Sequence, residues 1–176
     1  MSDLEFKAPW GRVLRVTSIS FTLLMLGVSL FLIVQAEPHF PARKLAFACL
    51  PTLILVSTVP FIIRRYRLRN ETLLIDRLFW ATEIPLTGLS SVEVTENAMK
   101  GSLRLCGNGG LYSFSGWWWS KRLGRYHPYV TDLDRTVVLR FGPRTIVLSP
   151  EIPTEFARDV SRFVTNPEPS GPAVGS

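Results

Sequence analysis

Residues 16–36 read VTSISFTLLMLGVSLFLIVQA, and residues 45–63 read LAFACLPTLILVSTVPFII. These stretches of 21 and 19 residues contain no charged side chain. A helix of about 19 residues is roughly 28 Å long, close to the thickness of the hydrocarbon core of a bilayer. The sequence therefore predicts two transmembrane helices, at about 16–36 and 45–63, which form a hairpin over residues 16–63.

Two other interpretations of these stretches have less support. Core helices of soluble proteins normally carry a polar stripe, and long apolar runs are instead typical of membrane spans. A cleaved signal peptide would end at Val34-Gln35-Ala36, but the apolar part of such a peptide is usually only about 7–15 residues long. Pro51 and Pro60 lie in the second stretch. Because membrane helices tolerate proline, we expect this helix to be bent rather than broken.

Basic residues flank the two stretches on one side. Lys7, Arg12 and Arg15 precede the first stretch, Arg64, Arg65, Arg67 and Arg69 follow the second, and only Arg43 and Lys44 lie in the connecting loop. The positive-inside rule therefore places both termini in the cytoplasm, with residues 1–15 as a cytoplasmic segment and residues 37–44 as an external loop. We expect a multi-pass protein of the inner or plasma membrane. The four arginines after the second stretch are also a candidate site for anionic lipids.

Residues 64–164 have the pattern of a mainly β domain. Apolar and polar residues alternate around residues 73–76, 92–95, 136–141 and 145–148, and residues 80–86, 111–119 and 126–131 are further predicted strands. At the end of the domain, one face of a helix would carry Ile152, Phe156, Val160, Phe163 and Val164. We predict a barrel or sandwich of about seven strands that a helix over residues 153–164 caps. Residues 165–176 are predicted to be a disordered tail.

This order of elements resembles pleckstrin-homology-like (PH-like) domains, in which a C-terminal helix caps seven strands. The chain is similar, more narrowly, to a bacterial pleckstrin-homology family found in small membrane proteins. The residues that carry the resemblance are Gly107-Asn108-Gly109-Gly110, Gly116-Trp117, Leu123-Gly124-Arg125-Tyr126, Tyr129-Val130-Thr131-Asp132, residues 137–141, and Leu148-Ser149-Pro150 leading to Phe156. The resemblance implies a PH-like fold and two spans beside the domain, but it implies no particular activity.

Relatives that bind phosphoinositides hold the headgroup with several basic residues around the first hairpin. We assign that hairpin to residues 76–80, where Arg77 is the one basic residue. Phosphoinositide binding is therefore not supported by the sequence.

A run of aromatic and basic residues is the candidate binding surface. Its members are Trp117, Trp118, Trp119, Lys121, Arg122 and Arg125. If the run is a strand, Trp118 points away from Trp117 and Trp119, and we expect Trp118 to be exposed. Exposed aromatic and basic residues are typical of membrane-interface and protein-binding surfaces. The alternative is that the three side chains simply pack within the domain or against the hairpin.

No combination of residues in the chain indicates catalysis. His39 and His127 are far apart, and Cys49 and Cys106 fit no metal-ligand spacing, so we expect no enzyme, no metal and no cofactor. Gly107-Asn108-Gly109-Gly110 is more typical of a turn between strands than of an anion-binding loop. The pI of 9.8 owes much to the arginines beside the second span, so it does not indicate nucleic-acid binding.

The sequence therefore predicts a membrane-anchored, non-enzymatic binding or regulatory module. The alternative is a structural accessory subunit that joins a larger membrane complex through its helices. In that case Gly27, Ser29, Ala46, Ala48 and Ser57 would allow close contact with a membrane-protein partner or with a second copy of the chain.

Overall fold

The computed structural model describes residues 3–35 and 42–164, apart from the side chains of residues 42–45. The predicted tail and most of the predicted external loop therefore lie outside the described residues. The elements, in chain order, are β1 (Leu4–Lys7), α1 (Arg12–Val34), α2 (Ala42–Thr58), the short 3₁₀ helix η1 (Val59–Phe61), β2 (Ile63–Arg69), β3 (Thr72–Arg77), β4 (Ala81–Pro85), β5 (Ser91–Val94), β6 (Leu103–Gly109), β7 (Phe114–Ser120), β8 (Gly124–Val130), β9 (Val137–Phe141), β10 (Arg144–Leu148) and α3 (Pro153–Ser161).

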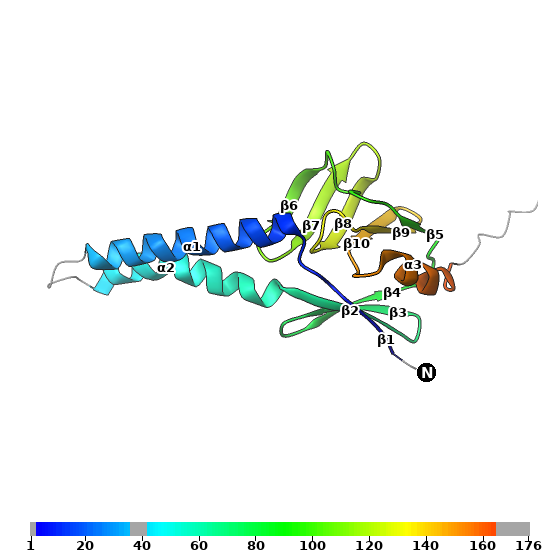
Figure 1. Ribbon diagram of the computed structural model, residues 1–176, viewed down its shortest axis with the longest axis horizontal. Coiled ribbons are helices and arrows are strands. Elements are labelled where there is room, and N and C mark those ends of the chain that lie inside the picture. Colours follow the sequence, from blue (N-terminus) through cyan, green and yellow to red (C-terminus); the bar gives the residue numbers. More distant parts are fainter. Residues whose placement is uncertain (1–2, 36–41, 165–176) are drawn as a thin grey trace, which may run out of the picture.

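Helices α1 and α2 lie side by side and project from one end of the β domain (Figure 1). Where they meet, Thr52 Oγ1 donates a 3.0 Å hydrogen bond to Ser29 Oγ, and Ser29 and Ala48 are buried. The other small residues, Gly27, Ala46 and Ser57, are exposed. Most large apolar side chains of α1 are also exposed, as expected for a helix that does not belong to a protein core.

The structure supports the two predicted spans unequally. Among the described residues, only α1 is long and apolar enough to cross a membrane. The apolar helix Ala46–Phe61 is shorter than the roughly 20 residues that a span normally needs. Helix α2 continues through Pro51, whereas Pro60 lies in η1. Helix α1 also starts before residue 16, and its Leu14 and Ser18 are buried.

The first sheet has the strand order β1-β2-β3-β4. Its edge strand β1 comes from the N-terminal segment and pairs with β2, with Lys7 opposite Arg65 and Leu4 opposite Leu68. The helical hairpin is thus an insertion between two adjacent strands. The sequence did not predict β1, because four residues are too few to establish an alternating pattern.

The second sheet has the strand order β5-β9-β10-β8-β7-β6, in which β10 and β8 run parallel and the other pairs run antiparallel. The described residues therefore form ten strands rather than about seven. Strands β1, β2 and β6 were not predicted. The two sheets that the described residues form are separate and do not close into the predicted barrel.

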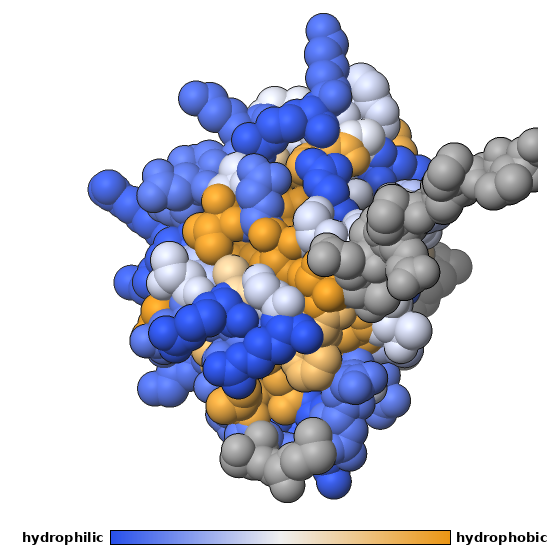
Figure 2. Space-filling view, turned by 90° about the vertical axis from the view of Figure 1, so that its right-hand side faces the viewer, coloured by the Kyte–Doolittle hydropathy of each residue, from blue (hydrophilic) through white to orange (hydrophobic). Residues whose placement is uncertain are grey.

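The main hydrophobic core joins residues of both sheets to α3. Tyr66 in the first sheet, Leu139 in the second and Phe156 in α3 are fully buried there. The predicted amphipathic helix is confirmed, although it ends at Ser161. Ile152, which precedes the helix, is 45% exposed. Figure 2 views the molecule from the α3 side, where hydrophilic side chains surround a band of hydrophobic surface.

A second core includes the first turns of α1 and residues of the second sheet. Leu14 packs in it with Phe114, Tyr126 and Val147, and Trp10 and Trp118 lie at its margin. The start of α1 is therefore fixed to the β domain rather than free.

Candidate functional site

Strand β7 divides the tryptophan run between two faces, as the alternation predicts. Trp117 and Trp119 are 39% and 38% exposed, whereas Trp118 packs against the second core with its ring 6.2 Å from that of Phe114. The indole Nε1 of Trp118 is buried and has no hydrogen-bond partner. The prediction that Trp118 is the exposed member is therefore wrong. Alternation places neighbours on opposite faces, but it does not say that a second core lies behind this sheet.

Only one of the three predicted basic residues joins Trp117 and Trp119. The guanidinium carbon of Arg125 lies 4.1 Å from the centre of the Trp117 ring, and Arg125 is also opposite Trp119 in the sheet. Arg122 donates a hydrogen bond to the Ala98 carbonyl, and Lys121 is exposed in the turn between β7 and β8. We call the uncovered surface of β6–β7–β8 the open face; it carries Leu103, Trp117, Trp119, Arg125 and His127.

The four arginines predicted to lie beside the membrane are part of β2. Three have carboxylate partners: Arg65 is 2.7 Å from Glu5, Arg67 is 2.7 Å from Asp76, and Arg69 is 3.7 Å from Asp3. Arg64 is exposed, and its carbonyl accepts a hydrogen bond from the Ala8 amide. The acids of β1 and β3 thus neutralise much of this cluster, which weakens it as a site for anionic lipids.

A cavity of about 700 Å³ lies between the end of α2 and the strands of both sheets. Its lining mixes aromatic, small and basic residues, and it includes no Asp or Glu: Thr58, Phe61, Arg77, Arg104, Gly107, Asn108, Leu111, Ser115, Gly116, His127 and Tyr129. The cavity continues into the open face, because His127 lines it and lies 3.8 Å, ring centre to ring centre, from Trp117.

Arg77 is the half-buried cation of this cavity. Its guanidinium carbon lies 5.7 Å, 5.8 Å and 5.9 Å from the ring centres of Tyr129, Phe61 and Trp80. One guanidinium nitrogen donates a 3.1 Å hydrogen bond to the Phe61 carbonyl, while the buried Nε has no partner. Burial lowers the pKa of Arg77, because removal from water disfavours a charge. No carboxylate among the described residues pairs with it.

His127 is the second polar residue of the cavity with an unpaired atom. Its buried Nδ1 has no hydrogen-bond partner. Burial, reinforced by the charges of Arg144 and Arg125, lowers the pKa of His127 and favours the neutral imidazole. The charges that lie near His127 are thus positive.

Two glycines bring β6 and β7 unusually close at the cavity wall. Gly107 and Gly116 are opposite each other with φ of 107° and 106°. A Cβ on Gly116 would lie 2.3 Å from the Cys106 carbonyl oxygen. The predicted glycine turn is displaced, because residues 107–109 belong to β6 and the chain reverses after Gly110. Asn108 closes this turn by hydrogen bonds with Leu111 in both directions.

Sequence reasoning missed the cavity because its residues come from distant segments. Phe61 was assigned to the second span, and Arg77 to the first hairpin of the domain. That hairpin is in fact the β2–β3 turn, where Asn70 and Glu71 both have positive φ, and Arg77 belongs to the next one. The feature of the sequence that could have indicated the cavity was the lone Arg77 close to Phe79 and Trp80.

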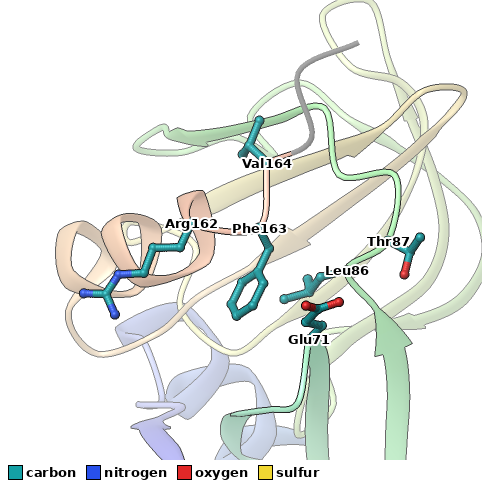
Figure 3. A pocket seen from close by; sticks show the side chains of 6 residues that line it. All are labelled: Glu71, Leu86, Thr87, Arg162, Phe163 and Val164. Atoms are coloured by element: carbon teal, nitrogen blue, oxygen red, sulfur yellow. The ribbon is translucent and has the colours of Figure 1, made fainter. Parts of the chain in front are cut away.

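A smaller pocket of about 250 Å³ lies between the β2–β3 turn and the end of α3 (Figure 3). The Phe163 ring points towards Leu86 and Glu71, while the Arg162 side chain points away. With one acid and one base in its lining, this pocket has no consistent charge preference. Among the described residues, no group of three or more His, Cys, Asp or Glu could hold a metal ion.

Two β sheets followed by a packed C-terminal helix fit the architecture of a PH-like domain. The chain belongs to the bacterial PH domain family, whose model matches residues 64–163. This match includes β2 to α3 and leaves out β1 and the apolar helices. Neither the curated proteins nor the solved structures contain a match to the chain.

Proposed function

We propose that the protein is a non-enzymatic PH-like binding module, which two membrane-spanning helices hold at the cytoplasmic face of the cell membrane. The observation that carries the proposal is the open face, where Trp117 and Trp119 lie uncovered beside Arg125. Tryptophan and arginine are enriched at the centres of binding interfaces. Membership of the bacterial PH domain family supports a binding or regulatory role.

The pairing of β1 with β2 supports two crossings rather than one. These strands flank the hairpin and lie in one sheet, so both ends of the hairpin are on the same side of any membrane. If α1 crosses, the chain must therefore return through α2. The η1 helix extends α2 towards the length of a span, since it continues the apolar segment to Phe61. Basic residues at the domain end of both helices favour the cytoplasmic side.

Site-specific photocrosslinking of the full chain in native membranes tests this function. A photoreactive amino acid replaces Trp119 on the open face, Phe31 on the outer surface of α1, or Phe79, an exposed control on the first sheet. The binding module predicts a discrete adduct from position 119 and none from position 79. Lack of an adduct at position 119 would contradict the use of the open face.

The second candidate function is a structural accessory subunit that assembles through its helices. Gly27 favours it, because this residue is exposed on α1 and has open space where a Cβ would be. A protein adduct from position 31, with none from position 119, would favour this alternative. Replacement of the outer part of the hairpin, after Thr22 and before Thr58, by an unrelated hairpin would then abolish the assembly.

A further inference from the structure

We infer that the cavity beside Arg77 holds the phosphate group of an anionic phospholipid from the adjacent membrane leaflet. This inference rests on the proposed function, because it takes the helical hairpin to be embedded in the membrane. It concerns a different part of the molecule from the β2 arginines, three of which already have carboxylate partners.

The charge of Arg77 favours the binding of an anion. A half-buried guanidinium without a carboxylate partner has lost part of its hydration and received no counter-ion in return. The three surrounding rings supply cation–π contacts, but a phosphate would add charge-assisted hydrogen bonds. Arg104, which also lines the cavity, has no carboxylate partner among the described residues either.

Polar atoms in the cavity can complete the binding of such a group. The buried Nε of Arg77 and the buried Nδ1 of His127 lack hydrogen-bond partners. A buried polar atom without a partner is costly in free energy, so the two atoms favour a polar occupant over an empty or purely apolar cavity. Since the lining has no acid, an anion meets no repulsion there.

The position of the cavity points to a membrane lipid as the source of the phosphate. Thr58 and Phe61, which line it, are at the end of the apolar α2–η1 segment. On the opposite side, the β6–β7 turn lies along α1: Thr17 Oγ1 donates to the Gly110 carbonyl at 3.0 Å, and the Thr22 and Tyr112 hydroxyls are 3.0 Å apart. Thr22 is ten residues after Arg12, or about 15 Å along the helix.

The turn therefore overlaps the first turns of the apolar helix, and the cavity beside it lies at the depth expected for headgroups. Tyrosine is enriched at this depth, which agrees with the place of Tyr112. Phe61 and Leu111 give the cavity an apolar side that suits the start of an acyl chain. Beyond Leu111, a smaller cavity of about 210 Å³ reaches Phe21 on the surface of α1.

The test titrates the full chain in neutral detergent with dihexanoyl phosphatidylglycerol and follows the rise in the midpoint of thermal unfolding. We expect saturable binding that Arg77→Gln weakens at least tenfold and Arg104→Gln weakens less. Arg64→Gln is the matched control, because Arg64 is exposed near the same helix end but outside the cavity. Its affinity should stay within twofold of the original. If Arg77→Gln does not fold, the affinity of Arg104→Gln for the lipid decides whether the cavity is the binding site. This variant is suitable because Arg104 is exposed.

Three results would overturn the inference: equal binding of dihexanoyl phosphatidylcholine, equal binding of inorganic phosphate, or an equal loss in Arg64→Gln. The first result would show that binding does not depend on an anionic headgroup. The second would show that the phosphate need not come from a lipid, and the third would show that the cavity is not the binding site. A separate extraction of native membranes at alkaline pH tests whether the chain is anchored in the membrane. Release of the chain would contradict the proposed function, whereas retention without lipid preference would contradict only the lipid site.

Discussion

The hydroxyl of Tyr66 in β2 donates a 2.6 Å hydrogen bond to the backbone carbonyl of Tyr129 in β8. Tyr66 is completely buried, and its hydroxyl also accepts from the Ser149 amide at 3.3 Å. One side chain thus connects the two sheets at the level of the cavity, because Tyr129 is also one of the aromatic residues around Arg77.

Replacement of Tyr66 by Phe should destabilise the domain and change its response to alkaline pH. The lost hydrogen bonds should cost about 1–3 kcal/mol, because two buried backbone groups lose a partner. Burial raises the pKa of Tyr66 from 10.0 to about 12. The unfolded chain therefore loses this proton near pH 10 while the folded chain keeps it, so stability is complete below pH 10 and falls towards pH 12. Unfolding midpoints in detergent, measured from about pH 8 to 11, should fall less steeply for Tyr66→Phe. Parallel curves would contradict the role of Tyr66.

Substitutions of Phe6 and Phe156 should show that β1 belongs to the folded domain. Their rings meet edge to face, with centres 5.1 Å apart. Phe156 is fully buried, so Phe156→Ala should cost about 3–5 kcal/mol, and Phe156→Asp more because it buries a charge. A double-mutant cycle with Phe6→Ala should give a coupling energy of about 0.5–1.5 kcal/mol. Ile152→Ala, at an exposed position, is the control and should cost under about 1 kcal/mol. Strict additivity of Phe6 and Phe156 would argue that β1 does not pack as described.

The close approach of β6 and β7 should make Gly116 intolerant of any side chain. Gly116→Ala combines a positive φ of 106° with a Cβ only 2.3 Å from the Cys106 carbonyl oxygen, so we expect a loss above about 2 kcal/mol. Gly124→Ala is the matched control, because Gly124 has φ +67° but nothing within 4 Å of its Cβ. It should cost about 1 kcal/mol, from backbone strain alone. Equal unfolding midpoints for the two variants would disprove the steric argument.

The proposed topology can be measured through the two native cysteines, both of which are free thiols. In a Cys49→Ala background, a membrane-impermeant maleimide should leave Cys106 unlabelled in intact cells and label it in inverted vesicles. A cysteine in place of His39, in the predicted external loop, is the opposite control and should react in intact cells. Labelling of Cys106 in intact cells would place the domain on the other side of the membrane.

Local patterns predicted those parts of the fold that a single segment determines. Alternation identified strands such as β9 and β10, and the spacing of Phe156 and Val160 identified α3 and its buried face. The same patterns cannot show which of the two faces of a sheet is covered by other parts of the chain. For this reason Trp118 was expected outside, although the start of α1 and the Ala98–Met99 segment contribute to a second core with which it packs.

Pairing between distant segments accounts for most of the remainder. Strand β2 reads in sequence as a basic cluster after an apolar helix, and only its pairing with β1 and β3 shows that Glu5, Asp3 and Asp76 neutralise it. The cavity likewise depends on Phe61, Arg77 and His127 meeting in space. The sequence does not show that these residues meet, because none of the three is near another in the chain.

The insertion of the helical hairpin between β1 and β2 has a consequence for biogenesis. Strand β1 leaves the ribosome first, and its partner β2 follows only after both helices have been made. If both helices cross the membrane, as proposed, the first sheet can be completed only in chains whose helices have inserted with their two ends on one side. With that topology, a chain inserted in any other way would keep an unpaired β2 edge, which is a template for aggregation. In the proposed topology, the pairing of β1 with β2 would thus depend on correct insertion, and a bulky N-terminal fusion would interfere with that pairing.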